Sequence, residues 1–83
     1  MNYTAEQINN AKTARDIASD ASEKIRELTG GDLSFICEPI PLKDYEFRLS
    51  LWTPDIPVGT WYIKDLDDLR VKIGVILKMY MEE

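Results

Sequence analysis

The chain has 83 residues, a net charge of −5 and a hydrophobic fraction of 45%. A chain this short forms a single compact domain, residues 1–83, around one hydrophobic core. The modest acidity disfavours a nucleic-acid-binding protein, which normally carries a basic patch. The absence of histidine removes the commonest general base and zinc ligand.

Residues 5–29 are predicted to form one long helix. Thr4 is a favourable N-cap, and Gln7 stands three residues later, where its side chain completes a capping box. Gly30 ends the helix, because glycine adopts the left-handed C-terminal conformation without a steric clash. The start of the helix also carries a pair suited to a hydrophobic staple, Tyr3 and Ile8.

This helix presents three faces of different chemistry. The inner face is a stripe of small and apolar residues that suits close packing on a sheet or on another helix, and it consists of Ala11, Ala14, Ala18, Ala21, Ile25 and Leu28. The opposite face, here named the acidic ridge, carries Asp16, Asp20, Glu23 and Glu27. Between the two runs a polar strip of Lys12, Arg15, Ser19, Ser22 and Arg26. The acidic ridge is either an ordinary solvated face or a row of carboxylates that replaces a phosphate backbone on a basic partner.

Three strands are predicted after the helix, at residues 33–38, 45–52 and 60–64. The second has the clearest period-two alternation, with Tyr45, Phe47, Leu49 and Leu51 inward and Glu46, Arg48, Ser50 and Trp52 outward. In the third, Trp61 and Ile63 are predicted to point inward. The proline-containing segments 39–43 and 53–59 are predicted loops.

A second helix is predicted at residues 66–81, with Asp65 as its N-cap. Its core face consists of Leu66, Leu69, Ile73, Ile76, Leu77 and Tyr80. A second group, here named the apolar strip, consists of Val71, Val75 and Met79. Either the first helix covers the apolar strip with Ile17 and Leu28, or a second copy of the chain covers it in a homodimer.

The sequence therefore predicts an α+β fold of two layers, helix-strand-strand-strand-helix, with an antiparallel sheet and both helices on one face. The element order resembles that of double-stranded-RNA-binding domains. Those domains place a basic cluster at the start of the last helix, whereas residues 64–68 of this chain read Lys-Asp-Leu-Asp-Asp and would repel phosphate. The resemblance is one of topology and implies no family.

Catalysis is difficult to build from this composition, and paired carboxylates would need unequal environments to act as acid and base. Cys37 has no histidine to activate it and no second cysteine to pair with, and its inward position is typical of an apolar core residue. Asp65, Asp67 and Asp68 are expected to start a helix, because their spacing lacks the glycine and distal glutamate of a calcium loop. We expect a protein that is not an enzyme and binds no metal or cofactor.

The location expected from the sequence is the cytoplasm. A single cysteine is typical of a reducing compartment, and the first residues lack the pattern of a signal peptide. The longest apolar run, residues 71–81, contains Lys72 and Lys78 and is too short to span a membrane.

The function expected from these patterns is protein–protein interaction without catalysis, as in small accessory proteins of bacteria and phages. Two surfaces are predicted to bind a protein partner. One is the acidic ridge, Asp16, Asp20, Glu23 and Glu27, which suits a basic partner, and the other is the outer face of the sheet with Arg48, Trp52 and Tyr62. One alternative is an inhibitor that mimics nucleic acid through the acidic ridge. The other is weak binding of single-stranded nucleic acid on the aromatic sheet face, which the net charge disfavours.

Overall fold

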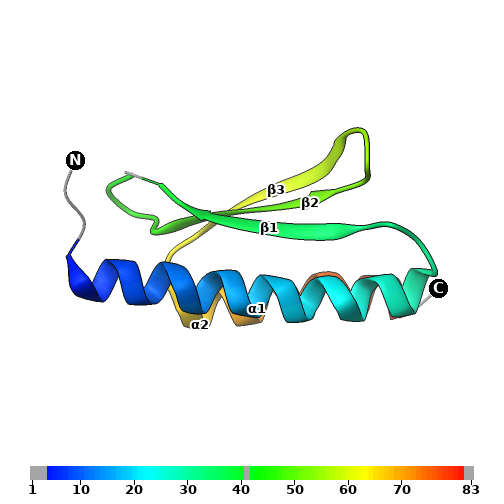
Figure 1. Ribbon diagram of the computed structural model, residues 1–83, viewed down its shortest axis with the longest axis horizontal. Coiled ribbons are helices and arrows are strands. Elements are labelled where there is room, and N and C mark those ends of the chain that lie inside the picture. Colours follow the sequence, from blue (N-terminus) through cyan, green and yellow to red (C-terminus); the bar gives the residue numbers. More distant parts are fainter. Residues whose placement is uncertain (1–3, 41, 82–83) are drawn as a thin grey trace.

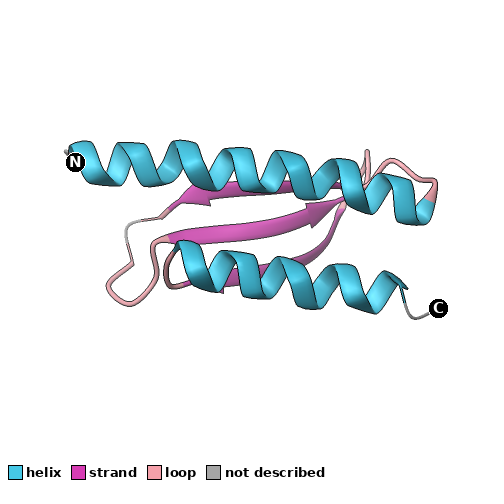
Figure 2. Ribbon diagram, turned by 90° about the horizontal axis from the view of Figure 1, so that it is seen from below, coloured by secondary structure: helices cyan, strands magenta, loops and turns pink. Residues whose placement is uncertain are grey.

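The computed structural model describes residues 4–40 and 42–81 (Figure 1). Its elements are α1 (Ala5–Thr29), β1 (Ser34–Pro39), β2 (Phe47–Trp52), β3 (Pro57–Ile63) and α2 (Leu66–Met81). The strands form one antiparallel sheet in the order β1-β2-β3. Both helices lie side by side on one face of this sheet and run in the same direction (Figure 2). The predicted α+β fold is confirmed.

Both ends of α1 are held by the predicted caps. The Thr4 hydroxyl accepts the N–H of Gln7 at 3.1 Å, and the Gln7 side chain accepts the N–H of Thr4 at 2.8 Å. Gly30 adopts the left-handed conformation with a φ of 64° and donates its N–H to the carbonyl of Arg26 at 2.8 Å. The capping box and the glycine stop are therefore confirmed. Of the predicted staple, Ile8 is exposed and Tyr3 lies outside the described residues.

The alanine stripe brings α1 close to the sheet. Ala14, Ala18, Ala21 and Ile25 are buried, and Ala11 is partly buried. The prediction for Leu28 was wrong, because 44% of this residue is exposed. A step of three residues rotates Leu28 by about 60° from Ile25 around the helix axis, at the end of α1 where no other described element covers it.

Two polar side chains of α1 bind the free edge of β1. The Ser22 hydroxyl accepts the N–H of Phe35 at 2.8 Å, although Ser22 is itself buried. One turn later, Arg26 donates from Nη1 to the carbonyl of Leu33 at 3.3 Å. An edge strand presents unpaired backbone groups to its surroundings, and these contacts satisfy the N–H of Phe35 in β1 and the carbonyl of Leu33 just before it.

The hydrophobic core lies between the inner face of the sheet and the two helices. Phe47 and Leu49 are 1% and 0% exposed, and Ile73 and Ile76 are 6% and 4% exposed, as the alternation and the helical periodicity predict. The other buried apolar residues are Ala14, Ala18, Ala21, Ile25, Phe35, Leu51, Ile63 and Leu69.

The second strand begins later than predicted. β2 starts at Phe47 rather than Tyr45, because the chain bends just before it and the N–H of Glu46 binds the carbonyl of Ile63 at 2.9 Å. Tyr45 therefore leaves the alternation and is 37% exposed instead of pointing inward. Its ring lies beside that of Tyr62, with 5.7 Å between the centroids.

The first and third strands are also displaced from their predicted ranges. β1 covers residues 34–39 instead of 33–38, and β3 covers 57–63 instead of 60–64. The actual turn is short, because the Thr53 hydroxyl accepts the N–H of Ile56 at 3.0 Å and the strand resumes directly afterwards. Gly59 lies inside β3 beneath the Trp61 ring, since a Cβ at Gly59 would stand 2.6 Å from a ring carbon of Trp61.

The substitution Leu49→Ala is expected to lower the free energy of unfolding by about 2–5 kcal/mol, through lost apolar transfer energy and a residual cavity. Urea denaturation measures this change. Ile36→Ala, at a residue 47% exposed on the other face of the sheet, is the matched control and should change stability little. Equal unfolding curves for Leu49→Ala and the parent would contradict the inward assignment of Leu49.

Removal of the Ser22 hydroxyl tests the contact between α1 and β1. Ser22→Ala leaves the buried N–H of Phe35 without an acceptor, which should cost about 1–3 kcal/mol. Ser19→Ala is the control, because Ser19 is exposed on the same polar strip. Both variants are compared with the parent by thermal and urea unfolding, and a Ser22→Ala protein as stable as Ser19→Ala would show that the hydrogen bond contributes nothing.

Candidate functional site

The side of the sheet that faces away from both helices, here named the outer sheet face, contains the predicted aromatic surface. Glu38, Arg48 and Tyr62 lie opposite one another across β1, β2 and β3. Arg48 forms an ion pair with Glu38, with 2.6 Å between Nη2 and Oε1. This hydrogen bond raises the pKa of the Arg48 guanidinium. The positive charge of Arg48 is therefore already neutralised by the carboxylate of Glu38.

Aromatic side chains lie at both ends of the outer sheet face. At one end the Tyr45 ring extends the row by its contact with Tyr62, which is 49% exposed. At the other end the half-buried Trp52 is in register with Pro57. The structure thus brings Arg48 and Tyr62 together. Trp52 lies four residues further along β2, beyond Ser50, and does not join them. Tyr45 was missed by the sequence reasoning, because its position depends on the bend before β2.

The centre of this face is occupied by smaller side chains. Ile36, Ser50 and Thr60 form the middle row across the three strands. Ser50 is only 7% exposed even though no helix covers it, because larger neighbours surround a short side chain on the central strand. The outer sheet face therefore has aliphatic and hydroxyl side chains at its centre and aromatic side chains at its ends.

The acidic ridge lies on the other side of the molecule. Its four residues are exposed, and α1 directs its alanine stripe, not this ridge, toward the sheet. Within residues 4–40 and 42–81, the ion pairs join Arg48 to Glu38, Arg70 to Asp67 and Lys72 to Asp68, and none lies on α1. The structure does not bring the acidic ridge and the outer sheet face into one site.

The apolar strip on α2 is exposed. Val71, Val75 and Met79 are 61%, 54% and 64% exposed, so the alternative in which Ile17 and Leu28 of α1 cover them is wrong. α1 instead packs against another flank of α2, where the two helices border a shallow groove of about 280 Å³. The residues lining that groove are Ile17, Asp20, Ala21, Lys24, Arg70, Ile73, Gly74 and Leu77.

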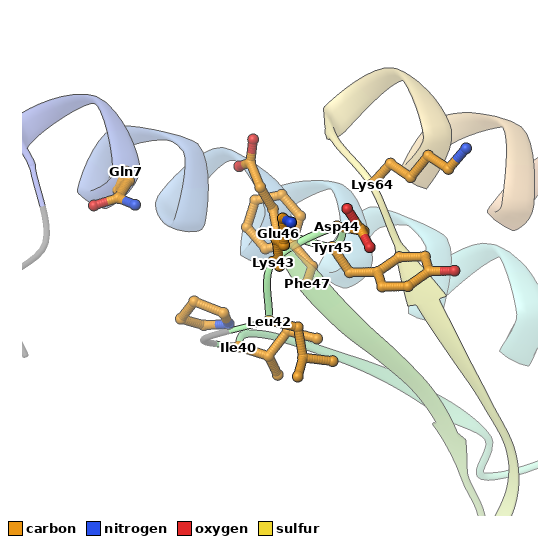
Figure 3. A pocket seen from close by; sticks show the side chains of 10 residues that line it. Gln7, Ile40, Leu42, Lys43, Asp44, Tyr45, Glu46, Phe47 and Lys64 are labelled. Atoms are coloured by element: carbon orange, nitrogen blue, oxygen red, sulfur yellow. The ribbon is translucent and has the colours of Figure 1, made fainter.

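A separate hollow of about 360 Å³ lies where the segment between β1 and β2 meets Gln7 of α1 and Lys64, the residue after β3. Figure 3 shows Ile40 and Leu42 together on one side of it, while Lys64 directs its ammonium group away from them. Its charged side chains carry opposite signs, as in Lys43 and Asp44. None of the predicted partner-binding residues lines this hollow, and no sequence motif marks it because loop residues assemble it.

The start of α2 uses its carboxylates structurally. Asp65 accepts the N–H of Asp68 at 2.8 Å, and Asp68 accepts the N–H of Lys64 at 3.0 Å. Asp68 also pairs with Lys72 at 3.0 Å. The bond from the Lys64 backbone, followed by the bond from Lys72, lowers the pKa of Asp68. These contacts hold the first turn of the helix, where the carboxylates of Asp65, Asp67 and Asp68 would repel phosphate.

Cys37 is a poor nucleophile in this fold. Burial, and to a smaller degree the neighbouring charge of Glu38, raises the pKa of its thiol from 9.0 to about 11. Among the described residues, no three side chains from His, Cys, Asp or Glu are grouped so that they could hold a metal ion. In the same part of the chain, no helix has the length and apolarity needed to cross a membrane.

No protein-family model matches the chain, and comparisons with curated proteins and with solved structures also found no match. The order of elements shared with double-stranded-RNA-binding domains therefore remains a likeness of topology alone.

Slow alkylation is expected at Cys37. A pKa near 11 leaves about a hundredfold less thiolate than a pKa of 9.0 at any pH well below both values. The native protein should therefore react with iodoacetamide about a hundredfold more slowly at about pH 8 than the same chain unfolded in urea. The two rates should converge only as the pH rises through 11, and equal rates near neutral pH would contradict the burial of the thiol.

Proposed function

We propose that this protein is a non-enzymatic interaction domain that binds a protein partner on its outer sheet face. One observation carries the proposal: no helix or strand of the described chain covers this face of the sheet, which carries aromatic residues and an arginine. Trp, Tyr and Arg are the residues most enriched where binding energy concentrates in protein interfaces. Tyr62 and Ile36 expose about half of their surface on this face, at 49% and 47%.

The charge of the outer sheet face favours a protein over nucleic acid. Single strands bind where stacked aromatics are combined with a positively charged groove. Here Arg48 is paired with Glu38 at 2.6 Å, and the whole chain has a net charge of −5. A protein surface with apolar groups and a few hydrogen-bonding groups suits this composition better than a phosphate backbone.

The acidic ridge supports the alternative function, inhibition of a basic nucleic-acid-binding protein by mimicry. Its four carboxylates are exposed, and none forms an ion pair within the part of the chain that the structure describes. A row of unpaired carboxylates is also what an ordinary solvated helix presents. The outer sheet face is therefore the better supported surface.

The two functions differ in which substitutions abolish binding. Parent protein, Tyr62→Ala, Trp52→Ala and the double variant Asp16→Asn/Glu23→Gln are immobilised, and nuclease-treated lysate of the native host is passed over each. The proposal expects a captured protein that the double variant retains and the two aromatic variants lose. With the purified partner, each aromatic substitution should weaken binding by at least about 2 kcal/mol, the loss typical of a central interface residue.

A salt titration of the same complex gives an independent criterion. Exposed charge pairs are screened as the ionic strength rises, whereas an apolar and aromatic contact is affected much less. Binding through the outer sheet face should therefore persist at high salt. Loss of the partner in Asp16→Asn/Glu23→Gln, together with a steep salt dependence and no effect of Tyr62→Ala, would replace the proposal with the mimicry alternative.

A further inference from the structure

The two edges of the sheet differ in how their backbone groups are satisfied. At the β1 edge, the N–H of Phe35 points to Ser22 and hence away from β2. Leu51 lies opposite Phe35. Two residues directly opposite each other in an antiparallel pair either exchange both backbone hydrogen bonds or exchange none, so the N–H and C=O of Leu51 point away from β1 and toward β3. Gly59, opposite Leu51, therefore directs its groups toward β2. Because the direction alternates along a strand, Thr60 and Tyr62 direct theirs away from the sheet.

The β3 edge has no neighbour to receive these groups. Among residues 4–40 and 42–81, no hydrogen bond outside the sheet reaches the backbone of Thr60 or Tyr62. Pro57 begins the strand and Lys64 follows it, but the residues between them carry no charge. Lysine, proline and bulges along an edge are the usual protection against strand pairing, and here they stand only at its ends.

The apolar strip lies on the same side of the molecule as this open edge. β1 and α1 occupy one side, and β3 and α2 occupy the other (Figures 1 and 2). Ile73, Gly74 and Leu77 are on the flank of α2 that borders α1. Helical geometry places Val75 about half a turn from Leu77, on the flank directed away from α1. An unpaired strand edge and an uncovered apolar helix flank thus adjoin each other.

We propose that the β3 edge and the apolar strip together bind a second copy of this chain around a two-fold axis at Thr60. In this register Thr60 faces Thr60 of the second copy, so their outward backbone groups pair with one another. Tyr62 faces Val58 of the second copy, the residue at which the pairing of β3 with β2 shifts in register. The facing side chains are β-branched or aromatic, which are favourable cross-strand pairs. Below the joined sheets, the two α2 helices bring their apolar strips into contact.

A second copy fits better than an unrelated strand. An added peptide strand would satisfy the edge but leave Val71, Val75 and Met79 uncovered. A second copy supplies both a strand for the edge and an apolar strip of matching chemistry for the helix. A two-fold axis makes each surface its own complement, and it is the commonest symmetry of homo-oligomers.

Amide hydrogen exchange of the full-length chain tests the strand pairing directly. In the monomer the amides of Thr60 and Tyr62 face solvent, so they should exchange rapidly at low protein concentration. In the dimer they should slow by on the order of a hundredfold, because exchange then requires the strand pair to open. Trp61, whose amide points to β2 in either state, is the internal control and should change less. Sedimentation velocity over the same concentrations reports the monomer and dimer.

Substitutions test separately how much the apolar strip and the β3 edge contribute to dimerisation. Val75→Asp should give a folded monomer, whereas Ile8→Asp, at a residue with a similar exposure of 52% against 54%, should remain a dimer. Thr60→Pro removes an N–H that β2 does not use, so it should also give a folded monomer. Val58→Lys places a charge beside the edge and replaces Thr60→Pro if that variant fails to fold. Circular dichroism and urea unfolding establish that each variant is folded.

Four results would overturn the proposal. The first is a parent that remains a monomer at millimolar concentration, and the second is a dimer in which Thr60 and Tyr62 exchange as fast as in dilute protein. The third is a folded Val75→Asp protein that still dimerises. The fourth is an unfolded Val75→Asp protein, since that would make the strip part of the core.

Discussion

The hydrogen bond from the Phe35 amide to the Ser22 hydroxyl, 2.8 Å long, is the contact on which the arrangement of the other elements depends. It forms only because Ala18 and Ala21 beside it are small enough for the helix to approach the strand closely. With α1 held along β1, the remaining apolar surface of the sheet is left for α2. The two helices then fill one layer, and nothing in the described chain remains to cover the opposite face.

This two-layer arrangement separates the chemistry of the chain into surfaces that do not meet. Carboxylates line the exposed side of α1, aromatic residues and a neutralised arginine line the far side of the sheet, and apolar residues line the outer flank of α2. Burial raises the pKa of the Cys37 thiol to about 11, so this thiol is protonated at neutral pH. The carboxylates, the aromatic residues and the apolar strip are thus exposed on three separate surfaces of the described chain.

Features that depend on neighbouring residues could be predicted from the sequence, and features that depend on strand register could not. Thr4, Gln7 and Gly30 act within one turn of a helix, so they fixed its ends correctly. Tyr45 fits the alternation of β2, but a bond between Glu46 and Ile63 bends the chain and moves it out. Gly59 resembles a loop residue, yet it lies in β3, where the Trp61 ring occupies the space that a side chain at Gly59 would need.

In the candidate site, too, local sequence pattern predicted the direction of side chains but not their partners. Alternation along β2 predicted that Arg48 and Trp52 point outward, but it contained no information on their partners. The pairing of Arg48 with Glu38 and the contact of Tyr45 with Tyr62 follow from the lengths of the connecting segments. Ser22 was assigned to a polar strip, and the available signal for its buried role was its place beside two alanines of the buried stripe.

The partial closure of the β1 edge by α1 also limits how far the chain can associate through its strands. A sheet with two free edges has a valence of two, and repeated addition of copies produces a fibre. α1 lies along β1 and binds the N–H of Phe35 and the carbonyl of Leu33, so it obstructs the addition of a strand at the first half of this edge. The β3 edge is therefore the more accessible of the two, and growth through both edges is hindered. The serine and the arginine on α1 thus hinder open-ended aggregation as well as stabilise the fold.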